Sequence, residues 1–312
     1  MINSIRKDVK NHALSQLGFD DCRFTKVDSP NNITRYKEWL SKNFHGEMSY
    51  LERHTAFKED LNLLLPDVKS AIVLAKNYKN TNKKHLNQKH KIARYAVGQD
   101  YHEVISKKLS HFERYLNTVL PEHNFYAGVD SRPIPERDLA LKAGIGFRGK
   151  NSMVIKPGLG SYFFLAVILS TYEFMPDQPS TVNCGQCRLC LDACPTGAIT
   201  DDYEVDSRKC ISYLTIEKKT PLNDGELQSL NNWMFGCDIC QEVCPYNHKQ
   251  GNLTNWKEFD SSGGVGFSFF DKQNPQTDLA LEIPKHSAMY RSRKNIGTIW
   301  KNIHASRPGI RG

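Results

Sequence analysis

The stretch "CGQCRLCLDACPTGAI" (residues 184–199) decides the architecture of this 312-residue chain. Its four cysteines are separated by two, two and three residues, and a proline follows the last of them. This spacing is typical of a run that binds a 4Fe-4S cluster. The run therefore predicts an iron-sulfur domain in the second half of the chain. The 183 residues before the run are too many for a simple electron carrier, so we expect them to form a domain that uses the electrons.

A second group of cysteines follows the first run: Cys210, and then three within "CDICQEVCPYN" (residues 237–247). In two-cluster ferredoxins the fourth cysteine of each run ligates the other cluster. By this rule we expect thiol set I to bind one cluster and thiol set II to bind the other. Set I comprises Cys184, Cys187, Cys190 and Cys244, and set II comprises Cys210, Cys237, Cys240 and Cys194.

Two other interpretations of the cysteines remain open. Paired zinc sites also take four thiolates each, although zinc ribbons use separated C-x-x-C pairs rather than a triple run. The clusters can also be purely architectural. Two clusters in one small domain favour a relay of single electrons, and about eight irons per chain are the expected content of two 4Fe-4S clusters.

The composition is that of a globular protein with a sizeable core: 39% of the residues are hydrophobic. No window approaches the roughly eighteen apolar residues of a membrane span, and charges run through the first eighteen residues, where a signal peptide would be apolar. We therefore expect a cytoplasmic, membrane-free protein whose cysteines are held by metal, since a reducing compartment does not keep structural disulfides. The remaining cysteine, Cys22, is predicted to be a core thiol.

The net charge of +8 is unevenly distributed. Basic residues interleaved with aromatic ones gather in residues 78–102 and 285–312, and such patches favour phosphate backbones. A solvated loop and a basic tail would have the same composition. The candidates for phosphate contact are Lys83, Lys84, Lys89, Lys91, Arg94, Arg291, Arg293 and Lys294.

Hydrophobic periodicity predicts a mixed α/β domain over residues 1–178. Helical spacing favours helices over residues 2–17, 101–120 and 136–144, and short apolar runs favour strands over residues 70–78, 124–130, 151–155 and 162–170. "GIGFRG" (residues 144–149) follows a helix and precedes a strand, so it is not a dinucleotide fingerprint. The predicted fold class is α+β: a linker over residues 171–183 leads to a ferredoxin-like domain (179–250). A C-terminal extension (251–312) then packs on the core or contacts nucleic acid.

Several long blocks in this order resemble the epoxyqueuosine reductases, which complete queuosine in tRNA. The blocks are "HGEMSYLERH" (45–54), "ARYAVGQDYH" (93–102), "VDSRPIPERDLALKAGIGFRGKNSMVI" (129–155), "GSYFFLAVIL" (160–169), "RKCISYLTIE" (208–217) and "GCDICQEVCPYN" (236–247). The resemblance implies an oxidoreductase that reduces epoxyqueuosine at the wobble position. Many members continue into a domain of helical repeats, whereas this chain ends about sixty residues after the last block.

The resemblance also implies cobalamin in the large domain, with two 4Fe-4S clusters feeding its cobalt. The family's proton donor matches Asp130 in "VDSRP". An acid working near neutral pH needs a raised pKa, which burial against the large cofactor and the substrate is expected to supply. The matched blocks place five further residues near cobalamin, and the resemblance implies no histidine ligand, so His45, His54 and His102 are not assigned to cobalt. The five are Arg53, Val154, Ser161, Tyr213 and Asp238.

Two alternative functions remain at this point. A reductive dehalogenase would pair the same two cofactors, although such enzymes commonly carry a twin-arginine export signal. An electron-transfer subunit would use the large domain only for docking, which leaves the matched blocks unexplained. The expected partners of the first function are tRNA and an external reductant such as flavodoxin or ferredoxin, with the chain acting as a monomer.

Overall fold

A four-stranded antiparallel sheet organises the first half of the molecule. The computed structural model describes residues 2–27, 33–80, 88–200, 203–248 and 253–305. The strands β1 (Asp21–Lys26), β2 (Ser70–Asn77), β7 (Phe163–Ser170) and β4 (Phe125–Gly128) pair in the order β1-β2-β7-β4. The register places Cys22 opposite Leu74 and Ile72 opposite Ile168.

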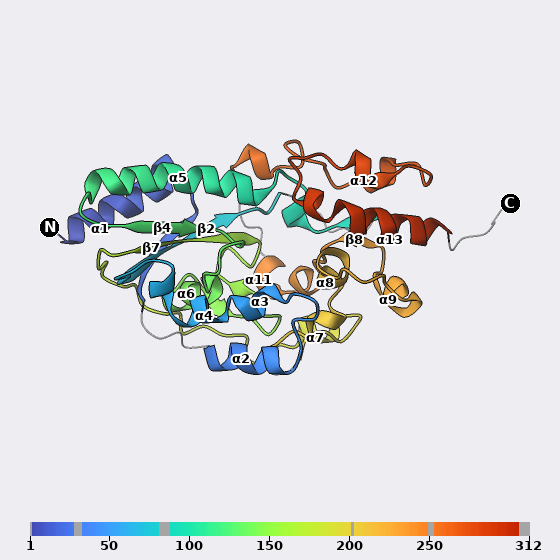
Figure 1. Ribbon diagram of the computed structural model, residues 1–312, viewed down its shortest axis with the longest axis horizontal. Coiled ribbons are helices and arrows are strands. Elements are labelled where there is room, and N and C mark those ends of the chain that lie inside the picture. The colour runs from blue at the N-terminus through green and yellow to red at the C-terminus, as the bar shows by residue number, and fades with distance from the viewer. Residues whose placement is uncertain (1, 28–32, 81–87, 201–202, 249–252, 306–312) are drawn as a thin grey trace.

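Both faces of this sheet are buried. Successive side chains of a strand point to opposite faces, so Ile72 and Leu74 join one core and Ala71 and Val73 join another. The helices α1 (Ile2–Asn11) and α5 (Tyr101–Val119) cover the first face, and α6 (Glu136–Lys142) packs on the second (Figure 1). This burial on both sides explains why β2 and β7 are continuous apolar runs.

Three short helices lie beyond α6 on the second face: α2 (Ile33–Ser41), α3 (Tyr50–Arg53) and α4 (Thr55–Glu59) (Figure 1). The polypeptide between α2 and α3 reaches the cysteine-rich region, because the backbone N–H of Glu47 donates to the Tyr213 hydroxyl (2.7 Å). The side chain of Trp39 donates to the carbonyl of Val205 (2.8 Å). These helices therefore connect the sheet to the iron-sulfur region.

The cysteine-rich region consists of short helices that follow one another closely. They are α7 (Leu189–Asp192), α8 (Ile211–Ile216), α9 (Asp224–Ser229), α10 (Ile239–Glu242) and α11 (Pro245–His248), with β8 (Trp233–Phe235) before α10. The two helices that carry the cysteine runs, α7 and α10, pack against each other. Strand β8 pairs in parallel with β3 (Lys91–Ile92) from the first half of the chain.

The C-terminal segment packs onto both halves of the molecule. Trp256 and Phe259 enter the core between the sheet and the helices α1 and α5, whereas Trp300 enters the core that contains α8 and β8. The helices of this segment are α12 (Leu279–Glu282) and α13 (Arg293–Ala305), drawn at the right of Figure 1. Among the described helices, none is long and apolar enough to cross a membrane.

The structure agrees with the helices and strands expected from periodicity, except at several ends. The helix expected over residues 2–17 changes to a π-helix at His12, and the strand expected over residues 151–155 is reduced to β6 (Val154–Ile155). The "GIGFRG" segment contains β5 (Phe147–Arg148) and opens no helix. Cys22 is fully buried, and burial raises the pKa of its thiol, as expected for a core thiol.

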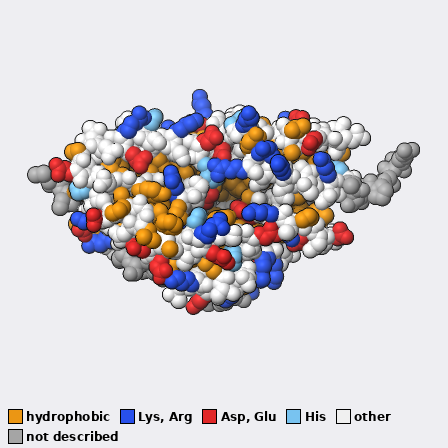
Figure 2. Space-filling model, viewed as in Figure 1, with side chains coloured by type: hydrophobic (Ala, Val, Ile, Leu, Met, Phe, Trp, Pro, Cys, Tyr) orange, Lys and Arg blue, Asp and Glu red, His pale blue; other side chains and the backbone are white. Residues whose placement is uncertain are grey.

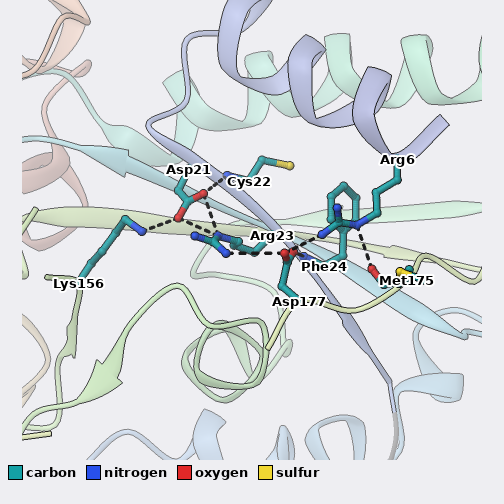
Figure 3. Close-up of polar contacts among 8 residues, drawn as sticks. All are labelled: Arg6, Asp21, Cys22, Arg23, Phe24, Lys156, Met175 and Asp177. Atoms are coloured by element: carbon teal, nitrogen blue, oxygen red, sulfur yellow. Dashed lines mark hydrogen bonds and ion pairs between the residues drawn. The ribbon is translucent and has the colours of Figure 1, made fainter. Parts of the chain in front are cut away.

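The segment expected to be a linker is instead bound to the edge of the sheet (Figure 3). Asp177 pairs with β1 through the backbone of Phe24: the Phe24 N–H donates to Oδ2 (2.9 Å), and the Asp177 N–H donates to the Phe24 carbonyl (2.8 Å). Its Oδ1 accepts from Arg6 of α1 (2.6 Å) and lies 3.6 Å from Arg23. The start of the cysteine-rich region is thereby attached to α1 and β1.

Replacing Asp177 with alanine should lower the free energy of unfolding by roughly 2–3 kcal/mol. The substitution leaves Arg6, Arg23 and the Phe24 N–H without their shared acceptor, and charged hydrogen bonds of this kind contribute that much. Urea unfolding followed by circular dichroism measures the effect. Glu173→Ala is the matched control, because its pair with Lys26 is exposed and should contribute less than about 1 kcal/mol. Equal losses for the two variants would contradict this account.

Candidate active site

Asp130 lies two residues beyond the end of β4, in a turn of unusual backbone geometry. Its φ is +48°, in the left-handed region that non-glycine residues rarely adopt. The turn is held because the Asp130 N–H donates to Oε1 of Glu136 (2.7 Å) and the Ser131 N–H donates to the Val129 carbonyl (2.5 Å). Strained residues of this type concentrate at functional sites. The side chain of Asp130 remains 60% exposed.

Two neighbouring residues at the start of α5 orient the Asp130 carboxylate. The Tyr101 hydroxyl donates to Oδ2 (2.7 Å), and Nε2 of His102 lies 3.1 Å from the same oxygen. Tyr101 is held by stacking against Phe164 of β7, with ring centroids 4.2 Å apart. Among the described residues, neither contact involves Oδ1, which is left available for a substrate.

The other nitrogen of His102 is bound by a second carboxylate. Nδ1 of His102 lies 2.6 Å from Oδ1 of Asp100, the N-cap residue of α5. Asp100 is buried and His102 is nearly so, with side-chain exposures of 7% and 16%. The result is a continuous chain of hydrogen-bonding groups from buried Asp100 through His102 to exposed Asp130.

The two carboxylates hold His102 in its protonated form. Burial alone would lower the pKa of His102, but the hydrogen bonds and charges of Asp100 and Asp130 raise it to about 9. For Asp130, burial raises the pKa, yet the hydrogen bonds from His102 and Tyr101 outweigh it and leave the pKa below its ordinary value. In the chain without cofactor or substrate the proton is therefore on His102, and the rise of the Asp130 pKa expected on burial against cofactor and substrate stays a prediction.

Charged groups from several elements surround Asp130. Burial and the Asp130 charge raise the pKa of Glu136 to about 8, while burial and Arg137 lower the pKa of Lys58 to about 8. On the face drawn in Figure 2, acidic, basic and histidine side chains gather around a central hollow that has apolar side chains within it. The groups whose charges interact with Asp130 are Tyr50, Lys58, Tyr95, Tyr101, His102, Glu136, Arg137 and Glu217.

The eight cysteines of the two runs interact in two groups. Burial and the charges of the other three members of thiol set I raise the pKa of Cys190 to about 11. Burial and the charges of two members of thiol set II raise the pKa of Cys237, the two being Cys210 and Cys194. The two sets adjoin each other, because the charge of Cys190 also acts on Cys240.

Each thiol set provides four thiolates, the number of donors that one 4Fe-4S cluster takes. Within the part of the chain that the structure describes, no three His, Cys, Asp or Glu side chains are grouped closely enough to bind a single metal ion.

The residues that the family resemblance places near cobalamin occupy different environments. Arg53 is exposed and donates to Ser49 (3.3 Å), whereas Val154 is buried. The hydroxyl of buried Ser161 donates to Gln241 (2.9 Å), and its N–H donates to Asn247 (2.8 Å).

The other two residues in this group belong to the cysteine-rich half and are also buried and hydrogen-bonded. The hydroxyl of Tyr213 accepts from the Glu47 N–H, and Oδ2 of Asp238 accepts from the Arg94 N–H (2.8 Å). Burial and the charges of Asp130 and Asp238 raise the pKa of Tyr95, so Tyr95 lies between the Asp130 turn and Asp238. The Asp130 turn therefore lies near the loop that follows Cys237.

The basic residues proposed from composition differ in their exposure. Arg94 is buried, with 4% of its side chain exposed, and pairs with Glu242 (3.2 Å), so its assignment as a phosphate contact is wrong. Lys83 and Lys84 lie outside the described residues. Lys89, Arg291 and Lys294 are exposed. The charge of Arg291 acts on Asp100, which places the C-terminal basic segment near the active-site chain.

Sequence reasoning found Asp130 but missed Asp100, His102 and Glu136 as its partners. Asp100 and Glu103 match the pattern of a helix N-terminus, which is a signal for the start of α5. No local pattern indicates that this helix N-terminus meets the turn after β4, thirty residues later. Only the antiparallel pairing of β4 with β7 and the packing of α5 on that sheet bring them together.

Two family models match the chain, and both agree with this geometry. Residues 58–131 match the family described as epoxyqueuosine reductase QueG, and residues 183–247 match the 4Fe-4S double cluster binding domain. The first match ends at the Asp130 turn, and the second contains both cysteine runs and Cys210, which lies between them. The eight cysteines thus lie within a domain that binds two 4Fe-4S clusters.

Known proteins resemble the chain over nearly its whole length. The epoxyqueuosine reductase of Leadbetterella byssophila is 37% identical over 91% of this chain and 97% of the relative. A crystal structure of epoxyqueuosine reductase with a tRNA-Tyr epoxyqueuosine-modified stem loop superposes with a TM-score of 0.81, at 27% identity, over 97% of this chain and 82% of that one. The Bacillus subtilis enzyme, with its catalytic aspartate loop swung out of the active site, superposes with a TM-score of 0.82 at 27% identity over the same shares. The chain belongs to the epoxyqueuosine reductase family.

Proposed function

We propose that the chain reduces epoxyqueuosine to queuosine in tRNA, with Asp130 as the group that protonates the departing oxygen. The observation that carries this proposal is the Asp130 carboxylate itself: it is 60% exposed, held in a strained turn, and connected to a protonated histidine. The resemblance to a structure that contains an epoxyqueuosine-modified stem loop supports the substrate. A tRNA substrate also supports a cytoplasmic location.

The reaction sets the requirements of the site. Conversion of an epoxide into an alkene breaks two C–O bonds, consumes two electrons and two protons, and releases the oxygen as water. Cobalamin, when bound, supplies a low-valent cobalt that can drive this reduction, and iron-sulfur clusters deliver electrons one at a time. The residues of the chain have to position the epoxide, exclude water and provide the protons at its oxygen. Oδ1 of Asp130 is the available atom for this contact.

The five residues expected to contact cobalamin would offer it groups of different kinds. Arg53 is the residue among the expected contacts that offers an exposed charged group. Val154 and Tyr213 would contribute apolar and aromatic surface. Ser161 and Asp238 would contribute mainly by shaping the wall, because their side chains already hydrogen-bond within the protein.

We propose thiol set I and thiol set II as the ligands of the two clusters. The interactions within each set support this assignment, and so does the match to a double-cluster domain. Set II includes Cys237, and the next residue, Asp238, acts on the same tyrosine, Tyr95, as Asp130 does. We therefore place set II on the side of the domain that faces the Asp130 turn. Electrons would pass from an external donor of the flavodoxin or ferredoxin class to set I and then to set II. The chain would carry out these steps as a monomer.

We propose that the exposed basic residues near α13 bind the phosphates of the tRNA stem loop. Replacing Lys89, Arg291 and Lys294 together with glutamine should reduce the dependence of log affinity on log salt by about two to three, because each phosphate contact contributes about 0.7–0.9. Stem-loop binding measured by fluorescence anisotropy at several salt concentrations tests this expectation.

The matched control for this triple variant neutralises three basic residues elsewhere, on α1 and the exposed side of α5. These residues are Lys7, Lys107 and Arg114, all exposed. The control should leave the salt dependence within about 0.5 of the wild-type value. Equal slopes for the wild type and the Lys89 triple variant would refute the proposed tRNA surface.

The proposed function can be tested with purified protein under anaerobic conditions. The chain is reconstituted with iron, sulfide and cobalamin, reduced chemically, and incubated with an epoxyqueuosine-modified stem loop or with a halogenated phenol. Conversion of the nucleoside to queuosine, with no dehalogenation, is the expected result. Dehalogenation without queuosine formation would favour the dehalogenase alternative, and iron incorporation without a corrin spectrum would favour an electron-transfer subunit.

A further inference from the structure

We propose that His102, oriented by Asp100, is the proton store from which Asp130 is replenished within one catalytic cycle. His102 is a positioning and proton-storing residue, because it contacts Asp130 and not the reacting atoms. The inference rests on the proposed function. It adds a defined path, Asp100–His102–Asp130, for protons that have to reach an oxygen from which water is excluded.

The stoichiometry of the reaction requires such a store. Both protons consumed by epoxide reduction end on the same oxygen, which leaves as water. Asp130 is ionised in the free chain, so it can protonate the oxygen only after it has taken a proton from a neighbouring group. Protonated His102 supplies the first of the two protons through Asp130, and the second follows the same path after solvent has reprotonated His102. Nε2 of His102 is 3.1 Å from Oδ2 of Asp130, within the range of direct proton transfer.

The geometry around His102 makes it a donor on both ring nitrogens. A neutral imidazole has one N–H and one acceptor nitrogen, so it can satisfy only one of two flanking carboxylates. Here Asp100 lies 2.6 Å from Nδ1 and Asp130 lies 3.1 Å from Nε2. The protonated ring satisfies both. Loss of the Nε2 proton to Asp130 leaves the remaining Nδ1–H directed at Asp100, which keeps the ring in place.

Asp100 is suited to this supporting role by its position. Its Oδ1 also accepts the backbone N–H of His102 (3.0 Å), so one carboxylate holds both the backbone and the ring of the histidine. Burial raises the pKa of Asp100, but the hydrogen bonds from His102 lower it below its ordinary value overall. Asp100 therefore remains charged and stabilises the protonated ring without taking the proton.

The remaining groups around the chain are consistent with proton transfer toward Asp130. Tyr101 donates to the same Oδ2, and its pKa is raised well above 10, mainly by burial and by the Asp130 charge, so it keeps its own proton. The positive groups that face Asp130 are Lys58 and Arg137, and Arg291 faces Asp100. The other titratable groups that face Asp130 are Tyr50, Tyr95, Glu136 and Glu217.

The first experiment is a histidine titration that needs neither cobalamin nor substrate. Imidazole resonances of the cluster-loaded chain are assigned by comparison with His102→Asn and followed by NMR from pH 5 to pH 10. The expected midpoint for His102 is near 9. In Asp100→Asn and in Asp130→Asn the midpoint should fall toward the ordinary value of about 6.5. A wild-type midpoint at or below 6.5, or no change in either variant, would overturn the proposal.

The second experiment measures single-turnover reduction of the epoxyqueuosine stem loop across the same pH range. His102→Asn should lower the rate roughly 10²-fold or more at neutral pH and remove the basic limb near pH 9, and added imidazole should restore part of the rate. Iron content and stem-loop affinity should be unchanged. His111→Asn, an exposed histidine on the same helix, is the matched control and should behave like the wild type.

The outcomes separate this inference from the proposed function. An active wild type with an equally active His102→Asn variant, showing the same pH profile, removes the proton store and leaves the function intact. A wild type that binds the stem loop without reducing it removes the proposed function. In that case the titration still decides whether Asp100 and Asp130 hold a proton on His102.

Discussion

Asp130→Asn should lower the rate of epoxyqueuosine reduction by roughly 10²- to 10⁴-fold, the usual contribution of a positioned general acid. Asparagine has nearly the shape of aspartate, and its side-chain oxygen can still accept from Tyr101, which lies 2.7 Å from Oδ2 in the structure. It cannot take a proton from His102 and pass it to the departing oxygen. The loss should therefore appear in the chemical step, not in binding.

Single-turnover kinetics with nucleoside analysis by mass spectrometry measures this effect. Cobalamin content, iron content and stem-loop affinity should match those of the wild type. Asp67→Asn is the matched control, because Asp67 is also an exposed aspartate with a positive φ (+58°) but lies outside the site. Turnover by Asp130→Asn within a few-fold of the wild type would remove Asp130 from the role of proton donor.

Two double substitutions should lower the iron content to different extents. If set I and set II each bind one cluster, Cys184→Ala with Cys244→Ala removes ligands of a single cluster, although the two residues belong to different runs. That variant should retain about four of the roughly eight irons. Cys184→Ala with Cys194→Ala, both in the first run, removes ligands from both clusters and should lose nearly all of the iron.

Loss of either cluster should also stop electron transfer to the active site. Either double variant interrupts the proposed relay, so reduction of epoxyqueuosine driven by a flavodoxin-type donor should stop in both. Iron quantitation and electron paramagnetic resonance of the reduced proteins measure the clusters that remain. The reverse pattern, with four irons retained after loss of Cys184 and Cys194, would mean that each run holds its own cluster.

Much of the fold follows from simple patterns, because its central strands are buried on both faces. The continuous apolar runs of β2 and β7 and the helical spacing in α5 were sufficient to predict those elements. Strand β1 was missed, since "DCRFTK" mixes inward Cys22 and Phe24 with polar residues and is recognisable only beside β2. The segment expected to be a linker has no helix or strand, but its attachment to β1 through Asp177 could not be predicted, because β1 was unknown from the sequence.

The site, like the fold, was predictable where it depends on local sequence and not where it depends on tertiary contacts. Cysteine spacing predicts two clusters, whereas the assignment of Asp130 came from family resemblance. The lowered pKa of Asp130 in the free chain could not be predicted, because it depends on His102 and Tyr101, which reach the turn through the tertiary fold. Arg94 was assigned to tRNA because it lies in a basic stretch, yet burial beside Asp238 and Glu242 gives it a structural role.

The most direct test of the central claim uses the tRNA of cells that lack this chain. Bulk tRNA is digested and its nucleosides are quantified by mass spectrometry. We expect epoxyqueuosine to accumulate and queuosine to disappear, with queuosine restored by the wild-type gene and not by the Asp130→Asn form. Normal queuosine with no accumulated epoxide in the deletion strain, in the absence of a second reductase gene, would contradict the account.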